Sequence, residues 1–192
     1  RIVCPYHAWS YATSGELLSV PGAESSFPGL EMSARGLARV PCAEAWGLVW
    51  LCPSAENDRH ATQVLQEHLA DIAGELDWLR LDSLQLFARS GRRWKANWKI
   101  FSEGGLETYH FKTAHGDTIG PYFPNNISLQ ESLGIHSRVV MPSEKIADYL
   151  DAPPAECSIR DFTHILLGVA PQSSFLVQEG HVDWIRMTPL AV

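Results

Sequence analysis

The sequence predicts an α+β protein with two domains, a small all-β domain in residues 1–56 and an unfinished α+β domain in residues 57–192. Three observations support this class. Short apolar runs separated by Gly and Pro turns dominate the first part of the chain. Helical spacing of apolar residues appears only after residue 57, and strand patterns return toward the end of the chain. A length of 192 residues is enough for one sizeable domain or two small ones.

The first domain is predicted to consist of short strands joined by turns. Strand patterns cover residues 1–4, 9–13 and 15–20, and further strand patterns lie in LARVPCAEAWGLVWL, residues 37–51. The polar, turn-rich run PSAENDRH, residues 53–60, marks the predicted boundary between the two domains.

The second domain is predicted to begin with a helix over residues 61–79, where apolar residues recur at helical spacing. Alternation of apolar and polar residues in LQLFARSGRRWKAN predicts a strand pair, or a strand with a turn, over residues 84–97. The pattern after Asn97 is mostly helical. Further strands are predicted at residues 134–141, 163–170, 174–180 and 181–187, with a short helix at 143–150.

Composition and charge exclude several classes of protein. Hydrophobic residues make up 45% and charged residues 19%, which is typical of a folded chain rather than a disordered one. A net charge of −7 provides no basic surface for nucleic acid or an anionic membrane. The sequence shows neither an apolar run of membrane-spanning length nor a signal-peptide pattern, which predicts a soluble cytoplasmic protein with reduced cysteines. Both ends run directly through strand patterns, so the chain is predicted to be an internal portion of a longer protein.

The first candidate site is the pair Cys4 and His7 in CPYHAWSY, where Pro5 stiffens the loop between them. A thiolate and an imidazole three residues apart are potential metal ligands. No second close pair of Cys and His follows that could complete a zinc site, so the residues alone leave the identity of the site open.

The longer run CPYHAWSYATSGELLSVPG resembles the second cluster-binding loop of Rieske-type ring-hydroxylating oxygenase large (alpha) subunits. The family pattern is C-P-Y-H-G-W-x-[YF]-x-x-x-G, and Ala8 stands where the family has Gly. The resemblance implies that Cys4 and His7 bind a [2Fe–2S] cluster, in which two cysteines hold one iron and two histidines hold the other. The family's other C-x-H pair lies upstream of this loop. Residues 1–56 are therefore predicted to be the second half of a Rieske domain.

The second candidate site lies in NWKIFSEGGLETYHFKTAH, residues 97–115, which places Glu107, His110 and His115 close together in sequence. Two histidines and one carboxylate are the ligands of non-haem Fe(II) centres that activate oxygen. On an ideal helix the two histidines would lie about 140° apart, so binding one metal requires a break, a bulge or a helix end between them. The residues alone leave two interpretations open, a metal site and the polar face of an amphipathic helix.

This run is similar to the catalytic motif of the same family, N-W-K-x-x-x-E-N-x-x-[ED]-x-Y-H-x-x-x-x-H. The resemblance implies that His110 and His115 bind a mononuclear Fe(II). It also implies that Glu107 is not a ligand. Instead, Glu107 is expected to carry electrons through hydrogen bonds to a cluster-binding histidine of the neighbouring subunit. His7 is a histidine of that kind.

The chain departs from that motif at Gly104 and Gly105, where the family has Asn and an aromatic residue. The family's third iron ligand is an Asp far beyond the second histidine, and it is expected to lie past Val192. Asp117 is the local alternative.

The two resemblances together predict the oxygenase component of a Rieske non-haem iron enzyme, a ring-hydroxylating dioxygenase or a monooxygenase or demethylase. Electrons from NAD(P)H would arrive through a reductase or a ferredoxin, and O₂ would hydroxylate an aromatic or other small organic substrate, as in aromatic hydrocarbon catabolism. The implied fold is a Rieske β domain followed by the N-terminal part of a helix-flanked antiparallel-sheet catalytic domain, residues 57–192. Electron transfer between subunits implies a homo-oligomer, commonly a trimer, in some members with a small beta subunit.

Two alternatives remain at this point. One is a non-enzymatic iron–sulfur electron-transfer protein whose second domain is only a scaffold. The other is a mononuclear metal hydrolase that uses His110, His115 and Asp117, which would leave the Cys4 loop without a role. The sequence does not specify the substrate.

Overall fold

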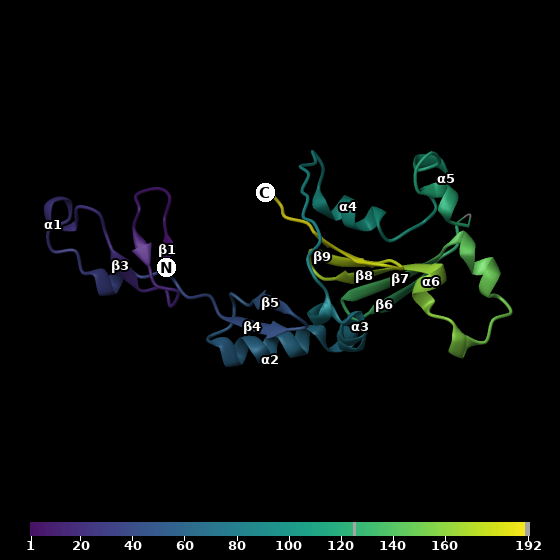
Figure 1. The fold of residues 1–192 in the computed structure, drawn as a ribbon, viewed down its shortest axis with the longest axis horizontal. Helices are drawn as coiled ribbons and strands as arrows, with labels where there is room; N and C mark the ends of the chain where they lie inside the picture. Colours follow the sequence, from purple (N-terminus) through teal and green to yellow (C-terminus); the bar gives the residue numbers. More distant parts are fainter. Residues whose placement is uncertain (125, 191–192) are drawn as a thin grey trace. The chain divides into compact units, whose positions relative to one another are not determined.

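The computed structural model describes residues 1–124 and 126–190, and its elements form two compact units (Figure 1). The first unit contains Arg1–Ala70 and Leu79–Ser83, and the second contains Asp71–Trp78 and Leu84–Val192. The mixture of helices with antiparallel sheets confirms the α+β class. A domain boundary between residues 56 and 57 stays a prediction.

The first unit contains the short strands that the sequence predicts. Strands β1 (Ile2–Val3), β2 (Ser10–Tyr11) and β3 (Leu17–Ser19) form a three-stranded antiparallel sheet. A helical turn, α1 (Ala23–Ser26), and a 3₁₀ helix (Met32–Arg35) lead to a hairpin of β4 (Cys42–Ala45) and β5 (Leu48–Leu51). The hairpin turn, Trp46–Gly47, has φ of 53° and 73°, the conformation that two-residue hairpin turns favour. A Cβ at Gly47 would lie 2.8 Å from the Asp82 Cα, so only glycine fits there.

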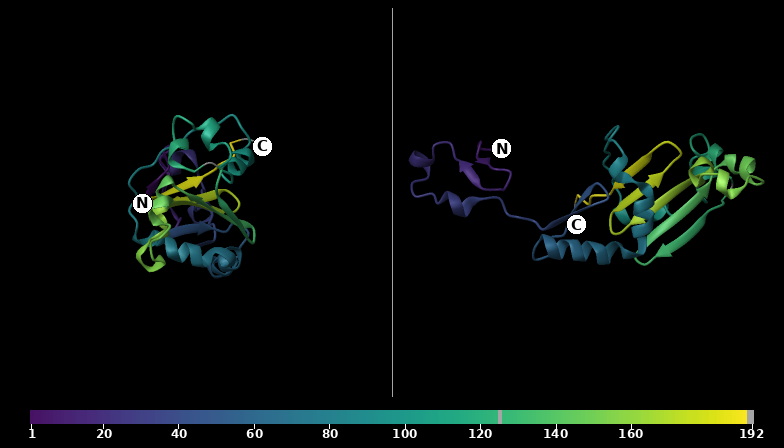
Figure 2. Two further views of the ribbon diagram at one scale, coloured as in Figure 1. Left: turned by 90° about the vertical axis from the view of Figure 1, so that its right-hand side faces the viewer. Right: turned by 60° about the horizontal axis from the view of Figure 1, so that its bottom comes forward.

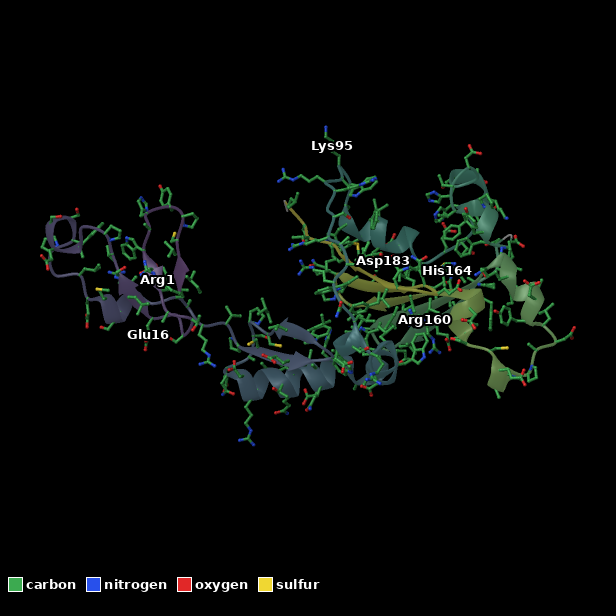
Figure 3. All side chains as sticks on the ribbon, in the orientation of Figure 1. Arg1, Glu16, Lys95, Arg160, His164 and Asp183 are labelled. Carbon is green, nitrogen blue, oxygen red and sulfur yellow. The ribbon has the colours of Figure 1, made fainter. Side chains whose placement is uncertain are left out.

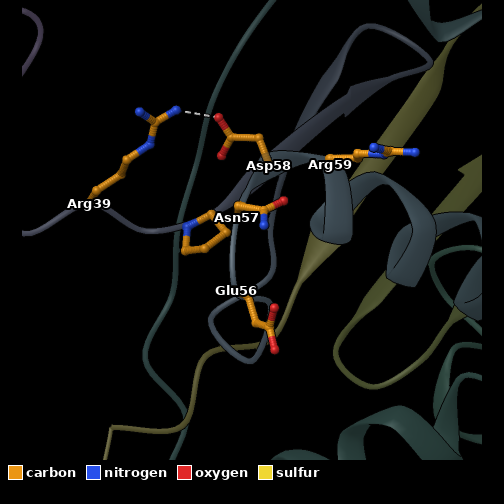
Figure 4. Close-up of a pocket in the computed structure, with 6 residues that line it drawn as sticks. Arg39, Glu56, Asn57, Asp58 and Arg59 are labelled. Carbon is orange, nitrogen blue, oxygen red and sulfur yellow. Dashed lines mark hydrogen bonds and ion pairs between the residues drawn. The ribbon is translucent and has the colours of Figure 1, made fainter.

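Helix α2 (Asp58–Leu69) begins with a conventional cap, in which the Asn57 side chain accepts a hydrogen bond from the His60 N–H at 3.0 Å. Asp58 accepts a hydrogen bond from the Cys42 N–H at 3.2 Å and another from the Arg39 guanidinium. Both hydrogen bonds lower the pKa of Asp58, and the one from the Cys42 N–H has the larger effect. A surface pocket of about 340 Å³ lies here, and the chain's own carboxylate already occupies the helix N-terminus (Figure 4). The pocket is lined by Arg39, Pro41, Glu56, Asn57, Asp58 and Arg59.

The predicted helix over residues 61–79 is present in three pieces. Helix α2 continues through a 3₁₀ turn (Ala70–Ile72) into α3 (Ala73–Leu79). The apolar stripe is buried as its spacing predicts, at Ala61, Leu65, Leu69, Ile72, Leu76 and Leu79. No helix in the described part of the chain is long and apolar enough to cross a membrane.

The second unit contains a five-stranded antiparallel sheet in which every strand pairs with its neighbour in sequence, in the order β10-β9-β8-β7-β6 (Figure 2). Four of these strands were predicted, and β6 was not. The strands are β6 (Leu129–Leu133), β7 (His136–Pro142), β8 (Thr163–Val169), β9 (Ser173–Val177) and β10 (Val182–Arg186). The predicted helix at residues 143–150 is a 3₁₀ helix, Glu144–Tyr149, and two further short helices follow it, a 3₁₀ helix at Pro154–Glu156 and α6 (Ile159–Phe162).

The prediction of strands over residues 84–97 is wrong. This segment contains no strand among the described residues and pairs with none of the described strands. Leu86 and Phe87 are 86% and 102% exposed, and Lys95 projects away from the sheet (Figure 3). Alternation favours an extended backbone, but a strand also needs a partner for its N–H and C=O groups.

One face of the five-stranded sheet packs against the helical layer of α4 (Trp98–Gly104) and α5 (Phe111–Ala114) (Figure 1). Register places Val139 opposite Leu166 and Leu166 opposite Leu176, so these side chains share that face. The core there consists of Phe123, Val139, Met141 and Leu166, with Leu106, Phe111 and Leu176 packed against it. This apolar layer supports the segment in which the second candidate site lies.

The other face carries an ion-pair network centred on Arg138 of β7. Its guanidinium donates to Glu75 of α3 at 2.9 Å and to Glu131 of β6 at 2.7–2.8 Å, with side chains that are only 24–36% exposed.

Replacing Arg138 by Met is expected to lower the free energy of unfolding by about 1–3 kcal/mol, because two carboxylates lose a charged donor. Urea unfolding measures this. Arg80→Ala removes a pair at 3.6 Å whose partners are 70% and 60% exposed, and should change stability by less than about 0.5 kcal/mol. Equal effects of the two changes would contradict the prediction.

Candidate functional site

Cys4 and His7 lie in the loop that joins β1 to β2. The Cys4 N–H donates to the Trp9 carbonyl at 2.8 Å, and the Ala8 N–H donates to the Cys4 carbonyl at 2.9 Å. These two bonds fix the turn that carries both candidate ligands. The Cys4 thiol is free, and the exposed His7 ring contacts Tyr6 with ring centres 3.8 Å apart. The loop therefore offers a thiol and an imidazole for binding, and cluster ligation by them stays a prediction.

Ala8 has a φ of 58°, in the left-handed region, at the position where the Rieske loop pattern has glycine. A left-handed residue with a Cβ costs about 1–2 kcal/mol, partly offset by the backbone entropy that glycine loses on folding. Ala8→Gly is therefore expected to stabilise this unit by about 0.5–1 kcal/mol, measured by thermal unfolding. Ala12, in the same unit, is not among the residues with positive φ, and Ala12→Gly should destabilise instead. The prediction fails if both glycines act in the same direction.

His110 and His115 flank α5, a single helical turn, rather than lying inside a longer helix. His110 precedes the turn, and His115 follows it with φ −119° and ψ 23°, outside the helical region. The two ring centres lie 5.3 Å apart. A helix end between the histidines, one of the three options that the spacing required, brings the rings together.

This separation fits two imidazoles on one metal ion. An imidazole whose nitrogen binds a metal at about 2.1 Å has its ring centre about 3.3 Å from the metal, so two such rings at angles of about 90–110° lie about 4.7–5.4 Å apart. The observed 5.3 Å falls in that range without rearrangement of the backbone. The pair can therefore supply two ligands of a mononuclear centre.

Glu107 is held against His110 in the turn between α4 and α5. Its carboxylate accepts hydrogen bonds from the His110 backbone N–H at 3.1 Å and from the His110 ring at Nδ1. Partial burial raises the pKa of Glu107, but the hydrogen bonds from the His110 ring and backbone together outweigh burial and lower it. With its proton on Nδ1, the His110 ring presents the lone pair of Nε2 for a metal.

No third ligand accompanies this pair in the part of the chain that the structure describes. Among residues 1–124 and 126–190, no three His, Cys, Asp or Glu side chains form a group that could hold a metal ion. His110, His115 and Asp117 therefore do not form the site that the hydrolase interpretation requires. Asp183 lies on β10, where its carboxylate accepts a hydrogen bond from Gln178 at 2.9 Å.

The two glycines that depart from the catalytic motif have different surroundings. A Cβ at Gly105 would lie 3.3 Å from the Leu166 Cδ2, so the end of α4 approaches the sheet closely where the family has an aromatic residue. A Cβ at Gly104 would meet nothing within 4 Å. The unusual position is therefore Gly105, which sits directly over the apolar layer.

Sequence reasoning missed one polar residue in this region. Thr108 is only 3% exposed, and its Oγ1 has no hydrogen-bond partner among the described residues. Threonine next to a motif residue carries no signal of burial in a single sequence, so only the packing reveals it.

Comparison with known proteins gives consistent matches. Residues 80–192 match the family described as ring hydroxylating alpha subunit (catalytic domain). The anthranilate 1,2-dioxygenase large subunit of Acinetobacter baylyi is 32% identical over 119 residues, which cover 58% of this chain and 24% of that protein. The glycine betaine monooxygenase oxygenase subunit of Chromohalobacter salexigens is 30% identical, covering 62% and 25%. The fold resembles the quaternary ammonium Rieske monooxygenase CntA, with a TM-score of 0.72 at 18% identity, covering 97% of this chain and 48% of that one. The chain thus spans about a quarter of those two curated relatives.

Proposed function

Because this chain belongs to the family of ring-hydroxylating alpha subunits, the large subunits of Rieske oxygenases, we propose that it forms part of an oxygenase that passes electrons from a [2Fe–2S] cluster to a mononuclear Fe(II). The observation that carries this proposal is the pair of imidazoles at the two ends of α5, with ring centres 5.3 Å apart. A non-enzymatic electron-transfer protein has no need of two such rings beside a hydrogen-bonded carboxylate.

Each residue of the site has a distinct task in this proposal. His110 and His115 would hold the Fe(II), which when bound supplies the activation of O₂ for hydroxylation. Glu107 keeps the His110 proton on Nδ1 and so orients the ring with Nε2 toward the metal. Its ionised carboxylate can also accept a hydrogen bond from a histidine of the neighbouring subunit's cluster. Leu106 and Phe111, packed on the sheet core, exclude water from the inner side of the turn.

The first unit has the complementary task. Cys4 and His7 would hold one half of the [2Fe–2S] ligand set, the other half coming from a C-x-H pair outside these residues. In this assignment residues 1–56 are the second half of a Rieske domain, and residues 57–192 are the N-terminal part of the catalytic domain. The match of residues 80–192 to the catalytic domain of the family supports the assignment of the second part of the chain.

The partners and substrate follow from the same proposal. Electrons from NAD(P)H would reach the cluster through a reductase or a ferredoxin, and Glu107 would link the two centres between subunits of a homo-oligomer. A small organic substrate is supported by the names of the relatives, which include an anthranilate dioxygenase and a glycine betaine monooxygenase.

Iron and acid-labile sulfide analysis, with EPR of the dithionite-reduced full-length protein, tests the proposal. We expect about three irons and two sulfides per chain, two irons in the cluster and one outside it, with a rhombic cluster signal. Two irons with a complete cluster signal would favour the electron-transfer protein instead. Zinc, or no metal in a folded protein, would overturn both.

A further inference from the structure

The loop that follows His115 folds back onto the backbone of that histidine. The His115 carbonyl accepts hydrogen bonds from the Thr118 N–H at 3.0 Å and from the Gly120 N–H at 2.8 Å. Gly120 is buried, and a Cβ there would lie 2.8 Å from the same carbonyl oxygen and 2.6 Å from the Phe111 carbonyl oxygen. Only glycine allows so close an approach, and this approach holds Thr118 next to His115.

The Thr118 side chain contacts His115 at two atoms. Its Oγ1 lies 3.3 Å from the His115 carbonyl oxygen and 3.5 Å from Nδ1 of the His115 ring. A threonine hydroxyl has one proton to donate and two lone pairs that accept. Because a carbonyl oxygen can only accept, the hydroxyl donates its proton there and faces the ring with a lone pair. Nδ1 of His115 then carries the proton of the second hydrogen bond, and the lone pair of the neutral ring is on Nε2.

The other candidate iron histidine has the same arrangement. The Glu107 carboxylate accepts a hydrogen bond from Nδ1 of His110. Glu107 precedes His110 by three residues, and Thr118 follows His115 by three. Each imidazole thus has an oxygen acceptor at Nδ1, supplied by the chain just outside its own end of α5. The two acceptors differ in charge, so the bond from His115 to the neutral hydroxyl is the weaker one.

We propose that Thr118 is a positioning residue for His115, whose hydroxyl keeps the ring proton on Nδ1 and leaves Nε2 free to bind the metal. This inference rests on the proposed function and adds a residue to that same site. An acceptor behind a metal-binding imidazole fixes the orientation of the ring and raises its basicity. Thr118 is exposed, so water competes for its hydrogen bonds and they contribute little to the stability of the fold. The effect of the hydroxyl should therefore appear in metal binding rather than in Tm.

The test compares Thr118→Val, which removes the hydroxyl and keeps the shape, with Thr118→Ser, which keeps the hydroxyl. Competition with a chelator measures the affinity of the full-length protein for mononuclear Fe(II). Valine should weaken this affinity about tenfold, and serine should stay within about twofold of wild type. EPR of the nitric oxide complex of this iron should change in the valine variant and return to the wild-type signal in the serine variant. The Tm of the valine variant without mononuclear iron should stay within about 2 °C of wild type.

Thr62→Val is the matched control. The Thr62 hydroxyl also donates to a backbone carbonyl, that of Asp58 at 3.0 Å, in an exposed part of α2. Its loss removes the same kind of hydrogen bond without an imidazole beside it. Iron affinity and the EPR signal should therefore stay at their wild-type values.

Three results in the variants would overturn the inference. Unchanged iron affinity in Thr118→Val would limit the hydroxyl to holding the His115 carbonyl. Tighter iron binding in the same variant would show that the hydroxyl donates to Nδ1 and so opposes the metal. A loss of affinity in Thr118→Ser as large as in Thr118→Val would assign the effect to the methyl group. Failure of the proposed function is separate, because it shows as wild-type protein without mononuclear iron and overturns this inference with it.

Discussion

Replacing His110 or His115 by Ala is expected to lower product formation by about 10³-fold or more while the [2Fe–2S] signal persists. The two imidazoles are the only ligands that the described residues bring together at this position, with ring centres 5.3 Å apart. Losing either leaves a single protein ligand in this part of the chain, so mononuclear iron should dissociate. Iron analysis, EPR of the reduced cluster and product formation with NADH and the reductase measure the three consequences separately.

The matched control is His68→Ala, which removes an exposed histidine of α2. It should retain iron, cluster signal and activity within about twofold, since exposed substitutions away from a site change little. If His110→Ala and His115→Ala keep the extra iron and turn over substrate, the metal assignment is wrong. The two histidines then belong to the polar surface of the helical layer.

The placement of the two histidines could be predicted in part from their spacing. A separation of about 140° on an ideal helix required an interruption, which the lower helix propensity of Phe111 and Thr113 and the glycine at position 116 made plausible. In the structure a Cβ at Gly116 would lie 2.9 Å from the Lys112 carbonyl oxygen, so glycine lets the chain leave the helical turn there. The ring separation could not be predicted, because it depends on the backbone angles at both ends of α5.

The sheet shows where local patterns stop being informative. Strands β7 to β9 contain buried apolar residues and were predicted, because apolar residues rich in β-branched types give a strand a clear signal. Strand β6, LQESL, lies at the sheet edge with half-exposed and exposed side chains, so its sequence resembles a loop. Residues 84–97 were predicted to be strands and are not. Their apolar and polar residues alternate clearly, but no described strand pairs with them.

The hydrogen-bond partners of polar side chains also cannot be predicted from a single sequence. Glu107 could be assigned a role from its motif position, but its two hydrogen bonds to His110 depend on the turn geometry. Whether Thr108 finds a partner depends on packing against residues distant in sequence, such as those of β7 and β8. These are the interactions that decide the chemistry of the site.

Glu107→Gln is expected to leave both metal centres in place and to slow electron transfer between them by about 10²-fold or more. Glutamine is nearly isosteric, but it lacks the negative charge that accepts hydrogen bonds from the His110 ring and from a cluster histidine. Charge-assisted hydrogen bonds are stronger than neutral ones, so the path between the centres is weakened without being removed. Single-turnover kinetics of the pre-reduced enzyme measure cluster reoxidation directly, apart from reduction by the electron donor.

Glu107→Asp provides the comparison, because it keeps the charge and shortens the side chain by one methylene. It should retain more of the transfer rate than glutamine does, whereas a purely structural role would rank the isosteric glutamine first.

The pKa of Glu107 is lowered from 4.5, so the stabilisation by its carboxylate is present above that value and is lost as the pH falls through the lowered pKa. Glu107 therefore contributes no change in wild-type transfer rate across the neutral range. A wild-type rate in the glutamine variant would reduce Glu107 to an anchor for the His110 ring and leave the path between the centres to other residues.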